Sequence, residues 1–321
     1  MPLNLNKSHF LKIFTLIITG FSIAFSTGCG ETSRYNIAVI VKSTTSDFWK
    51  GVKDGVEAAA VGYSAQVSFD GPENEEDQLA QNSMVLKAIA DGVDAIVLSA
   101  VNPVSAKNAV DAAVAAGIKV IEIDSGTDSD RTSCFIGTDN KEAGELAGKA
   151  AFDATDSDVV AGIVSCGDNS ENLKNRCDEL IRYIESNGGK VAGVSNSASD
   201  TQSAKKAAGE LLTANRDINV LIGINEWATL GAGYYIRENG LGDGIACVGF
   251  DSNRAAIGML ETGELDALIV QNPFAIGYLG VESAVKLLRG ENVVDVTTSL
   301  TVITSENMFE PENQRKVFRL N

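Results

Sequence analysis

Histidine is almost absent from this 321-residue chain, and the single one, His9, lies in an apolar N-terminal segment. Without histidine the rest of the chain has no Ser-His-Asp or Cys-His catalytic group and no His-ligated metal site. The sequence also lacks GxGxxG after its first apolar run, GxxxxGK[ST] and GxSxG, which are signatures of nucleotide binding and hydrolase chemistry. We therefore expect no enzyme, no cofactor and no metal ion.

Basic residues are also scarce. Lys and Arg number 26 against 43 Asp and Glu, which gives a net charge of −17, and the basic residues form no cluster. Binding to nucleic acid requires a concentrated positive field, so nucleic acid is excluded as a partner. The chain is 44% hydrophobic and 21% charged, a composition typical of globular proteins, and its length predicts two domains.

The first thirty residues have the pattern of an export signal. Lys7 precedes an almost wholly apolar stretch, residues 10–25, and Lys12 lies near its start. No acidic residue occurs before Glu31. The stretch leads to Ser26-Thr27-Gly28-Cys29, which resembles a bacterial lipobox. We expect residues 1–28 to be a lipoprotein signal peptide and Cys29 to be acylated. An uncleaved anchor is the alternative, although a membrane span needs about 20 apolar residues.

The chain has four further cysteines, and no two of them form a CxxC pair: Cys134, Cys166, Cys177 and Cys247. This absence argues against a zinc site or thioredoxin-like chemistry. Cys134 and Cys247 lie in apolar runs, so we favour small buried hydrophobic side chains. A disulfide between Cys166 and Cys177 is the alternative, because an exported protein meets oxidising conditions.

Short apolar runs alternate with segments of helical periodicity along the chain. Most runs are continuous in Val, Ile, Leu and Ala, which is typical of parallel strands buried on both faces. This alternation, with Gly after many helices, predicts doubly wound parallel sheets, and nine strands suit two sheets better than one. The predicted strands are Asn36–Val41, Gln66–Phe69, Ala95–Leu98, Lys119–Ile123, Val159–Val164, Lys190–Val194, Val220–Ile224, Ala246–Gly249 and Ala267–Val270. The predicted helices are Phe48–Ala60, Glu75–Ala90, Val104–Ala116, Lys141–Phe152, Leu173–Ser186, Thr201–Ala214, Leu230–Glu238 and Ala275–Leu288.

The loops after the strands carry hydroxyls, amides, carboxylates and aromatic rings. Ligands of open α/β sheets bind at the carboxyl ends of the strands, and such a set suits a small hydroxylated molecule. For any one residue, an ordinary polar loop or helix cap is the alternative. The acidic pair Glu75-Glu76 falls on a predicted exposed helix turn and does not indicate glycosidase chemistry. The loop residues include Ser43, Ser99, Asn102, Asp124, Ser125, Asp168, Asn169, Lys174, Asn225, Glu226, Phe250, Asp251, Gln271 and Asn272.

These loops resemble those of the type I periplasmic binding proteins, most of all the ribose-binding proteins that supply ABC importers. The likeness runs from about residue 35 to about residue 304, and the order of its motifs is more specific than any one of them. The motifs are FWKGVKDG at 48–55, IEID at 121–124, IGTDN at 136–140, NE at 225–226, VGFD at 248–251 and QNP at 271–273.

The resemblance implies a fold and a set of binding residues. The fold is two Rossmann-like, doubly wound lobes joined by a three-segment hinge, with residues 34–138 plus 271–299 in the N-terminal lobe and 139–270 plus 300–321 in the C-terminal lobe. The implied ligand-binding residues are Phe48, Trp49, Ser99, Asp124, Lys174, Asn225, Phe250, Asp251 and Gln271.

The chain departs from the family pattern at several of these places. Lys174 stands for the sugar-binding Arg of the family, with Arg176 two positions on. Ser125 stands where an Arg usually follows the binding Asp, Ser46-Asp47 replaces Asn-Pro, and Ser199 replaces a second stacking aromatic. Because Lys and Arg are not equivalent hydrogen-bond donors, we expect either a sugar that differs from ribose or a ligand that is not a simple sugar.

The function implied is capture of a monosaccharide between the lobes and its delivery to an ABC permease. The resemblance and the N-terminal pattern together describe a monomer, lipid-anchored to a bacterial membrane in the periplasm or at the cell surface. The alternative is a binding protein that presents a sugar or signal molecule to a membrane receptor.

Overall fold

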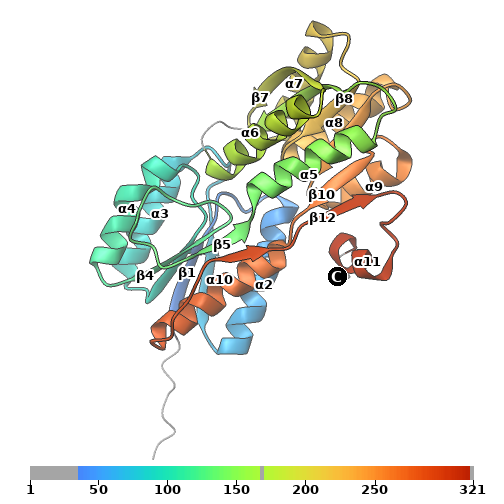
Figure 1. The fold of residues 1–321 in the computed structure, drawn as a ribbon. Helices are drawn as coiled ribbons and strands as arrows, with labels where there is room; N and C mark the ends of the chain where they lie inside the picture. Colours follow the sequence, from blue (N-terminus) through green and yellow to red (C-terminus); the bar gives the residue numbers. More distant parts are fainter. Residues whose placement is uncertain (1–34, 167–169, 319–321) are drawn as a thin grey trace, which may run out of the picture. The chain divides into compact units, whose positions relative to one another are not determined.

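The computed structural model describes residues 35–166 and 170–318, and within them it has two six-stranded sheets (Figure 1). The predicted signal peptide and Cys29 lie outside the described residues. The strand orders are β11-β5-β4-β3-β1-β2 and β12-β10-β9-β8-β6-β7. Every recorded pairing is parallel except that of β12 with β10. This confirms the predicted α/β fold of two doubly wound lobes.

The first lobe has helices on both faces of its sheet. One core joins the sheet to α2 and α10, and another joins it to α3 and α4. Its strands are β1 (Asn36–Ile40), β2 (Gln66–Asp70), β3 (Ala95–Leu98), β4 (Lys119–Ile123), β5 (Phe135–Thr138) and β11 (Val296–Thr298). Its helices are α2 (Asp47–Tyr63), α3 (Gln78–Asp91), α4 (Pro103–Ala115) and α10 (Pro273–Leu288).

The second lobe repeats this plan. Helices α5 and α6 cover one face of its sheet, and α7, α8 and α9 cover the other. Its strands are β6 (Val160–Cys166), β7 (Lys190–Ser197), β8 (Val220–Gly223), β9 (Ala246–Phe250), β10 (Ala267–Val270) and β12 (Thr301–Thr304). Its helices are α5 (Asn140–Asp153), α6 (Glu171–Ser186), α7 (Thr201–Ala214), α8 (Glu226–Asn239), α9 (Arg254–Thr262) and α11 (Pro311–Val317).

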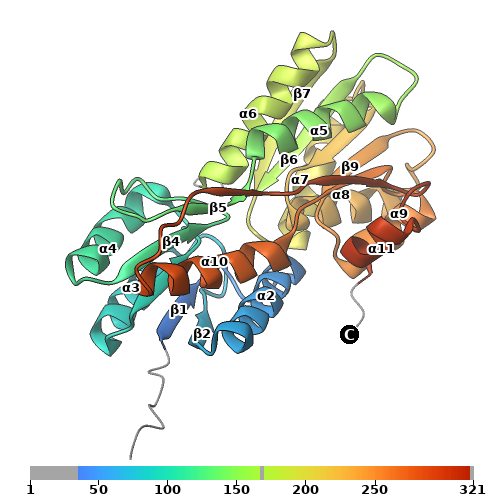
Figure 2. The same ribbon diagram turned by 60° about the horizontal axis from the view of Figure 1, so that its bottom comes forward.

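The chain passes between the two sheets three times: from β5 to α5, from β10 to α10, and from β11 to β12 (Figure 2). Two of these crossings touch, because Thr138 Oγ1 donates a hydrogen bond of 2.8 Å to Gln271 Oε1. The predicted three-segment hinge is therefore present.

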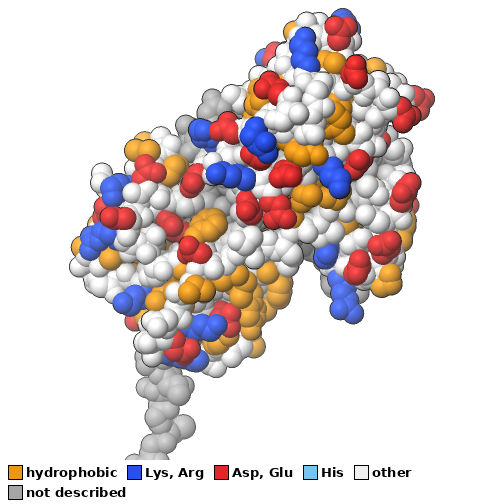
Figure 3. Space-filling model, viewed as in Figure 1, with side chains coloured by type: hydrophobic (Ala, Val, Ile, Leu, Met, Phe, Trp, Pro, Cys, Tyr) orange, Lys and Arg blue, Asp and Glu red, His pale blue; other side chains and the backbone are white. Residues whose placement is uncertain are grey.

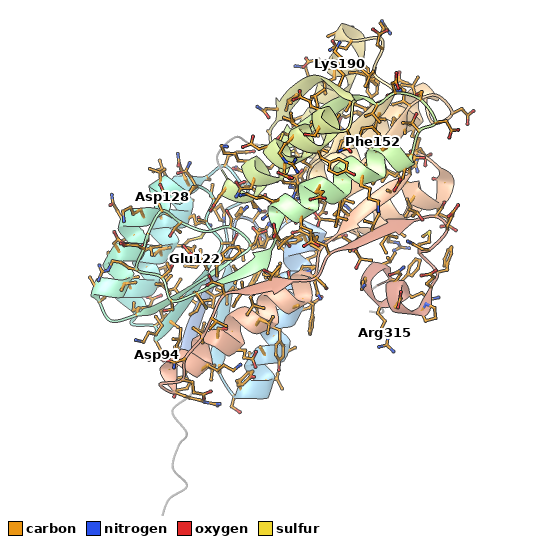
Figure 4. All side chains as sticks on the ribbon, viewed as in Figure 1. Asp94, Glu122, Asp128, Phe152, Lys190 and Arg315 are labelled. Atoms are coloured by element: carbon orange, nitrogen blue, oxygen red, sulfur yellow. The ribbon has the colours of Figure 1, made fainter. Side chains whose placement is uncertain are left out.

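The carboxyl ends of the strands in the two sheets face each other. In Figure 4, Asp94 before β3 and Lys190 at the start of β7 lie at opposite ends of the view, and Glu122 near the end of β4 lies between them. A hydrogen bond from Asn172 on α6 to Asp124 after β4 joins the two ends. The loops that follow the strands therefore meet between the lobes.

Each of the nine predicted strands is present, but β5, β11 and β12 were not predicted. They have three or four residues each, with the sequences FIGT, VTT and TVIT, in which Thr or Gly interrupts or flanks one or two apolar residues, so they lack the long apolar runs that mark the others. The predicted helix start at Glu75 is wrong. Helix α3 begins at Gln78 because the side chain of Asp77 caps it by accepting from Ala80 N.

None of the four cysteines of the described residues takes part in a disulfide. Cys134, Cys166 and Cys247 are buried, as expected of small hydrophobic side chains, and burial raises the pKa of each. Cys166 Sγ lies 3.0 Å from Ser197 Oγ. The alternative Cys166–Cys177 bridge is therefore not formed.

The surface in Figure 3 carries Lys and Arg interspersed with Asp and Glu, without a basic cluster on that face. Hydrophobic side chains gather over α2 and α10, where Phe274 is half exposed and stacks on Tyr278. In the described part of the chain, no helix combines the length and apolar character needed to cross a bilayer.

Candidate functional site

Asp124 ends the buried strand β4 and receives hydrogen bonds from both lobes. Its Oδ2 accepts from Ser99 Oγ at 2.9 Å and lies 3.1 Å from Lys42 Nζ, two groups that follow β3 and β1. Its Oδ1 accepts from Asn172 Nδ2 on α6 of the second lobe at 3.2 Å. Asp124 is only 4% exposed. A carboxylate buried to this degree is stable only when donors surround it, and one of these donors comes from the other lobe.

Lys42 is the cation of this group and is itself buried. Besides its ion pair with Asp124, its Nζ donates to Asn172 Oδ1 at 3.1 Å. Removing one partner of a buried ion pair leaves an uncompensated charge. Lys42, Asp124 and Asn172 therefore form one unit across the two lobes.

Asp251 occupies the matching place in the second lobe, directly after β9. Its Oδ1 accepts from Gln271 Nε2 at 2.8 Å. Burial raises the pKa of Asp251 to about 6, although the Arg176 guanidinium and the Gln271 hydrogen bond oppose the rise. Asp251 and Asp124 both have left-handed backbones, with φ of 69° and 58°. Such conformations cost about 1–3 kcal/mol and concentrate at functional sites.

Arg176 lies on α6 and is almost fully buried, at 1% exposure. Its guanidinium carbon lies 4.2 Å from the ring centroid of Phe250. Its Nη1 donates to Ile224 O at 2.6 Å and its Nη2 to Asn140 Oδ1 at 2.8 Å. Among the described residues its Nε has no hydrogen-bond partner. The guanidinium is therefore fixed in place while its Nε–H lacks an acceptor among the described residues.

The structure corrects the assignment of Lys174. Residues two apart on a helix point about 200° apart, so Lys174 and Arg176 cannot share a face of α6. Lys174 is exposed and pairs with Asp178, one turn further on. The buried place belongs to Arg176, whose planar fork of donors lines the cavity between the lobes.

Phe48 and Trp49 begin α2, where Ser46 caps the helix by accepting from Trp49 N. Their rings meet edge to face with centroids 4.9 Å apart. Trp49 is 2% exposed, and its Nε1 donates to Glu75 Oε1 at 2.9 Å. Glu75 is therefore part of this site and not on an exposed helix turn as predicted.

Glu226 links the second lobe to the start of α2. Its carboxylate accepts from Asp47 N at 3.1 Å and from Phe48 N at 3.0 Å. Free amide groups and the helix dipole make a helix N-terminus a favourable place for an anion. Burial raises the pKa of Glu226, and these two backbone hydrogen bonds oppose the rise.

These groups line one cavity between the lobes. Its predicted members are Phe48, Trp49, Asp124, Asn225, Asp251 and Gln271. Seven of its polar or aromatic members were not among the predicted binding residues: Lys42, Ser46, Glu75, Asn172, Arg176, Glu226 and Trp227. Ser99 and Phe250 are not on its wall. Ser99 lies behind Asp124 as a hydrogen-bond donor, and Phe250 lies behind Arg176 as a packing platform.

Two further cavities adjoin this one. A groove of about 840 Å³ shares Phe48, Asp251 and Gln271 with it and extends between α2 and α9. A pocket of about 270 Å³ shares Asp124 and Asn172 with it. The central wall thus combines four carboxylates, two cations, amides and aromatic rings, which suits a polar, hydroxylated ligand.

The raised pKa of Asp251 predicts a pH dependence of stability. The carboxyl group of Asp251 binds its proton more tightly in the folded state than in the unfolded state. The protonated group therefore stabilises the ligand-free protein below pH 4. That contribution, on the order of 2–3 kcal/mol, is lost as pH rises to about 6. Asn tolerates a left-handed backbone, so Asp251→Asn removes the titration and keeps the conformation.

Urea unfolding of the ligand-free protein between pH 4 and 7 tests this prediction. Stability of the parent should fall more steeply between pH 4 and 6 than that of Asp251→Asn. Equal slopes for both proteins in this range would show that Asp251 titrates normally.

The chain matches one protein family and is similar in sequence to a known import protein. Residues 37–292 match the family described as "Periplasmic binding protein domain". The chain is 26% identical over 273 residues to the ribose import binding protein RbsB of Bacillus subtilis, covering 82% of this chain and 85% of that protein.

Two solved structures have closely similar folds. A carbohydrate transporter solute binding protein from Agrobacterium radiobacter, in complex with D-arabinose, has a TM-score of 0.86 and 28% identity, and the match covers 89% of this chain and 99% of that one. An ABC transporter solute binding protein from Agrobacterium vitis, with bound D-fucose, has a TM-score of 0.84 and 32% identity, with coverage of 88% and 100%.

Proposed function

Because this chain belongs to the periplasmic binding protein domain family, we propose that it captures a monosaccharide between its two lobes and delivers it to the permease of an ABC importer. It is a solute-binding protein and not an enzyme. The family places it in the periplasm. Relatives named for ribose import and similar structures that hold arabinose and fucose support a sugar as the ligand.

The observation that carries this proposal is the origin of the cavity wall. Lys42, Trp49 and Asp124 come from the first lobe, whereas Arg176 and Asp251 come from the second. The cavity has a volume of about 40 Å³ and adjoins the groove of about 840 Å³. A ligand that occupies the two together contacts both lobes at once. Its binding free energy therefore shifts an equilibrium between open and closed arrangements of the lobes, and no bond is made or broken.

The lobes we assign are residues 34–138 plus 271–299 and residues 139–270 plus 300–321, which move about the three crossings. Within the cavity we assign Phe48 and Trp49 to the apolar C–H face of the sugar, since aromatic rings pack on such faces. We assign the sugar hydroxyls to Asp124, Asp251, Asn225 and Gln271. Arg176 replaces Lys174 in this set, and Lys42 joins it.

Arg176 offers the sharpest test of the binding site because Lys174 is a matched control on the same helix. Arg176→Gln should weaken binding of a monosaccharide by about 2–4 kcal/mol, because the cavity loses a buried charged donor. Lys174→Gln should leave binding unchanged. Candidate sugars, D-ribose, D-arabinose and D-fucose among them, are first identified by thermal shift of the parent.

Calorimetry with a sugar that shifts the parent then compares the two variants. A loss of affinity in Lys174→Gln with none in Arg176→Gln would place the ligand elsewhere. Circular dichroism of Arg176→Gln checks that the variant is folded.

We also propose that the protein acts as a monomer and is lipid-anchored through Cys29, which follows the apolar segment and Thr27-Gly28. Two or more acyl chains hold a protein on a membrane without a spanning helix. Mass spectrometry of the membrane fraction should find a mature N-terminus at acylated Cys29. Cys29→Ser should release the protein or block its processing. An intact Met1 on the isolated protein would rule out the anchor.

A further inference from the structure

Glu75 is a carboxylate of the cavity that lacks a matching cation. It lies in the loop between β2 and α3, and its Oε1 accepts from the neutral Trp49 indole N–H. Among the residues that the structure describes, no Lys or Arg forms an ion pair with it within 4.0 Å. Glu75 is half-buried, and a carboxylate drawn out of water without a cation is costly, so Glu75 is poised for a partner from outside the chain.

The other three carboxylates on the wall are already compensated. Asp124 pairs with Lys42 at 3.1 Å. Glu226 accepts two amide hydrogen bonds at the start of α2. Asp251 is stabilised by Arg176 and by the hydrogen bond from Gln271. Both cations on the wall are therefore engaged with Asp124 and Asp251. Of the two carboxylates left without a cation, Glu226 has two backbone amide donors at the start of α2, whereas Glu75 has only the neutral indole N–H of Trp49.

The same wall also holds two hydrogen-bond donors that need acceptors. Arg176 Nε and Trp227 Nε1 are buried and have no partner among the described residues. Leaving a buried donor unpaired costs about 1–3 kcal/mol. A ligand that fits this wall therefore offers oxygen acceptors to these donors and a donor to Glu75.

We propose that the ligand is an amino sugar, whose hydroxyl oxygens accept from Arg176 Nε and Trp227 Nε1 and whose protonated amino group binds Glu75 beside Trp49. This inference rests on the proposed function, because it takes the cavity as the sugar site. A hydroxyl of a neutral sugar can also donate to Glu75, but it leaves the negative charge unmatched. An ammonium group supplies the charge, and the indole ring of Trp49 adds a cation–π contribution.

The electrostatic surroundings of Glu75 agree with this assignment. Burial raises the pKa of Glu75, and the negative charges of Asp124 and Glu226 raise it further. Lys42 and the Trp49 hydrogen bond act in the opposite direction. A cationic ligand group beside Glu75 would oppose this rise, because it stabilises the charged carboxylate.

Matched ligands test the inference by calorimetry at pH 6.5. The pairs are D-glucose with D-glucosamine and D-galactose with D-galactosamine, and the N-acetyl form of each amine lacks the positive charge. At least one amine should bind about tenfold or more tightly than its hydroxyl and N-acetyl counterparts, as expected of a charge-assisted hydrogen bond.

Variants at residue 75 assign the preference to its carboxylate. Glu75→Gln should abolish the preference for the amine while keeping an acceptor for Trp49, and Glu75→Asp should keep part of it. Glu73→Gln, an exposed position on the same loop, should behave as the parent. Thermal unfolding of each variant confirms that it is folded.

The inference is overturned if neutral sugars bind as tightly as their amines, or if Glu75→Gln keeps the preference. Binding of neutral sugars alone would leave the proposed function standing. Binding of neither series, nor of D-ribose, D-arabinose or D-fucose, would instead remove the proposed function and the inference together.

Discussion

The buried carboxylate of Asp124 is the interaction on which the site depends. A charge that is only 4% exposed needs several donors, and the chain supplies them from the ends of β1 and β3 and from α6 of the other lobe. Asp124 directly follows the buried strand β4, which holds it in place in the first lobe. The hydrogen bond to Asn172 then ties the second lobe to the same point. The wall of the cavity therefore comes from both lobes.

The second lobe repeats this solution with different partners. Asp251 also follows a buried strand and has a left-handed backbone conformation. Its partners are Gln271 at a crossing and the guanidinium of Arg176. In each lobe, one residue with a strained backbone thus directs its carboxylate into the space between the lobes. Glu226 adds a third link by holding the start of α2, the segment that carries the two aromatic rings.

Much of the fold could be predicted from sequence because the buried parallel strands are continuous apolar runs. The same pattern located the loop residues Asp124, Asp251 and Gln271, since ligands of such sheets bind at strand ends. The short polar hinge strands β11 and β12 carry no such signal. They exist because they extend sheets that other strands have already formed.

The misassigned site residues have physical explanations. Whether Lys174 or Arg176 points inward depends on which face of α6 packs against the rest of the protein. The sequence of α6 contains several charged residues and does not define that face. Glu75 belongs to a run of acidic residues that resembles a helix start, but Asp77 caps the helix and leaves Glu75 in the loop. Lys42 lies two residues after the end of β1, and its burial there is explained by its ion pair with the buried Asp124.

The central claim is that the ligand draws the two lobes together. Small-angle X-ray scattering measures this directly, on the protein alone and at saturation with a sugar that calorimetry has shown to bind. The account predicts a smaller radius of gyration with the sugar bound, and no such change when the same sugar is added to Asp124→Ala at the same concentration. A radius of gyration unchanged by a sugar that binds the parent would contradict capture between the lobes.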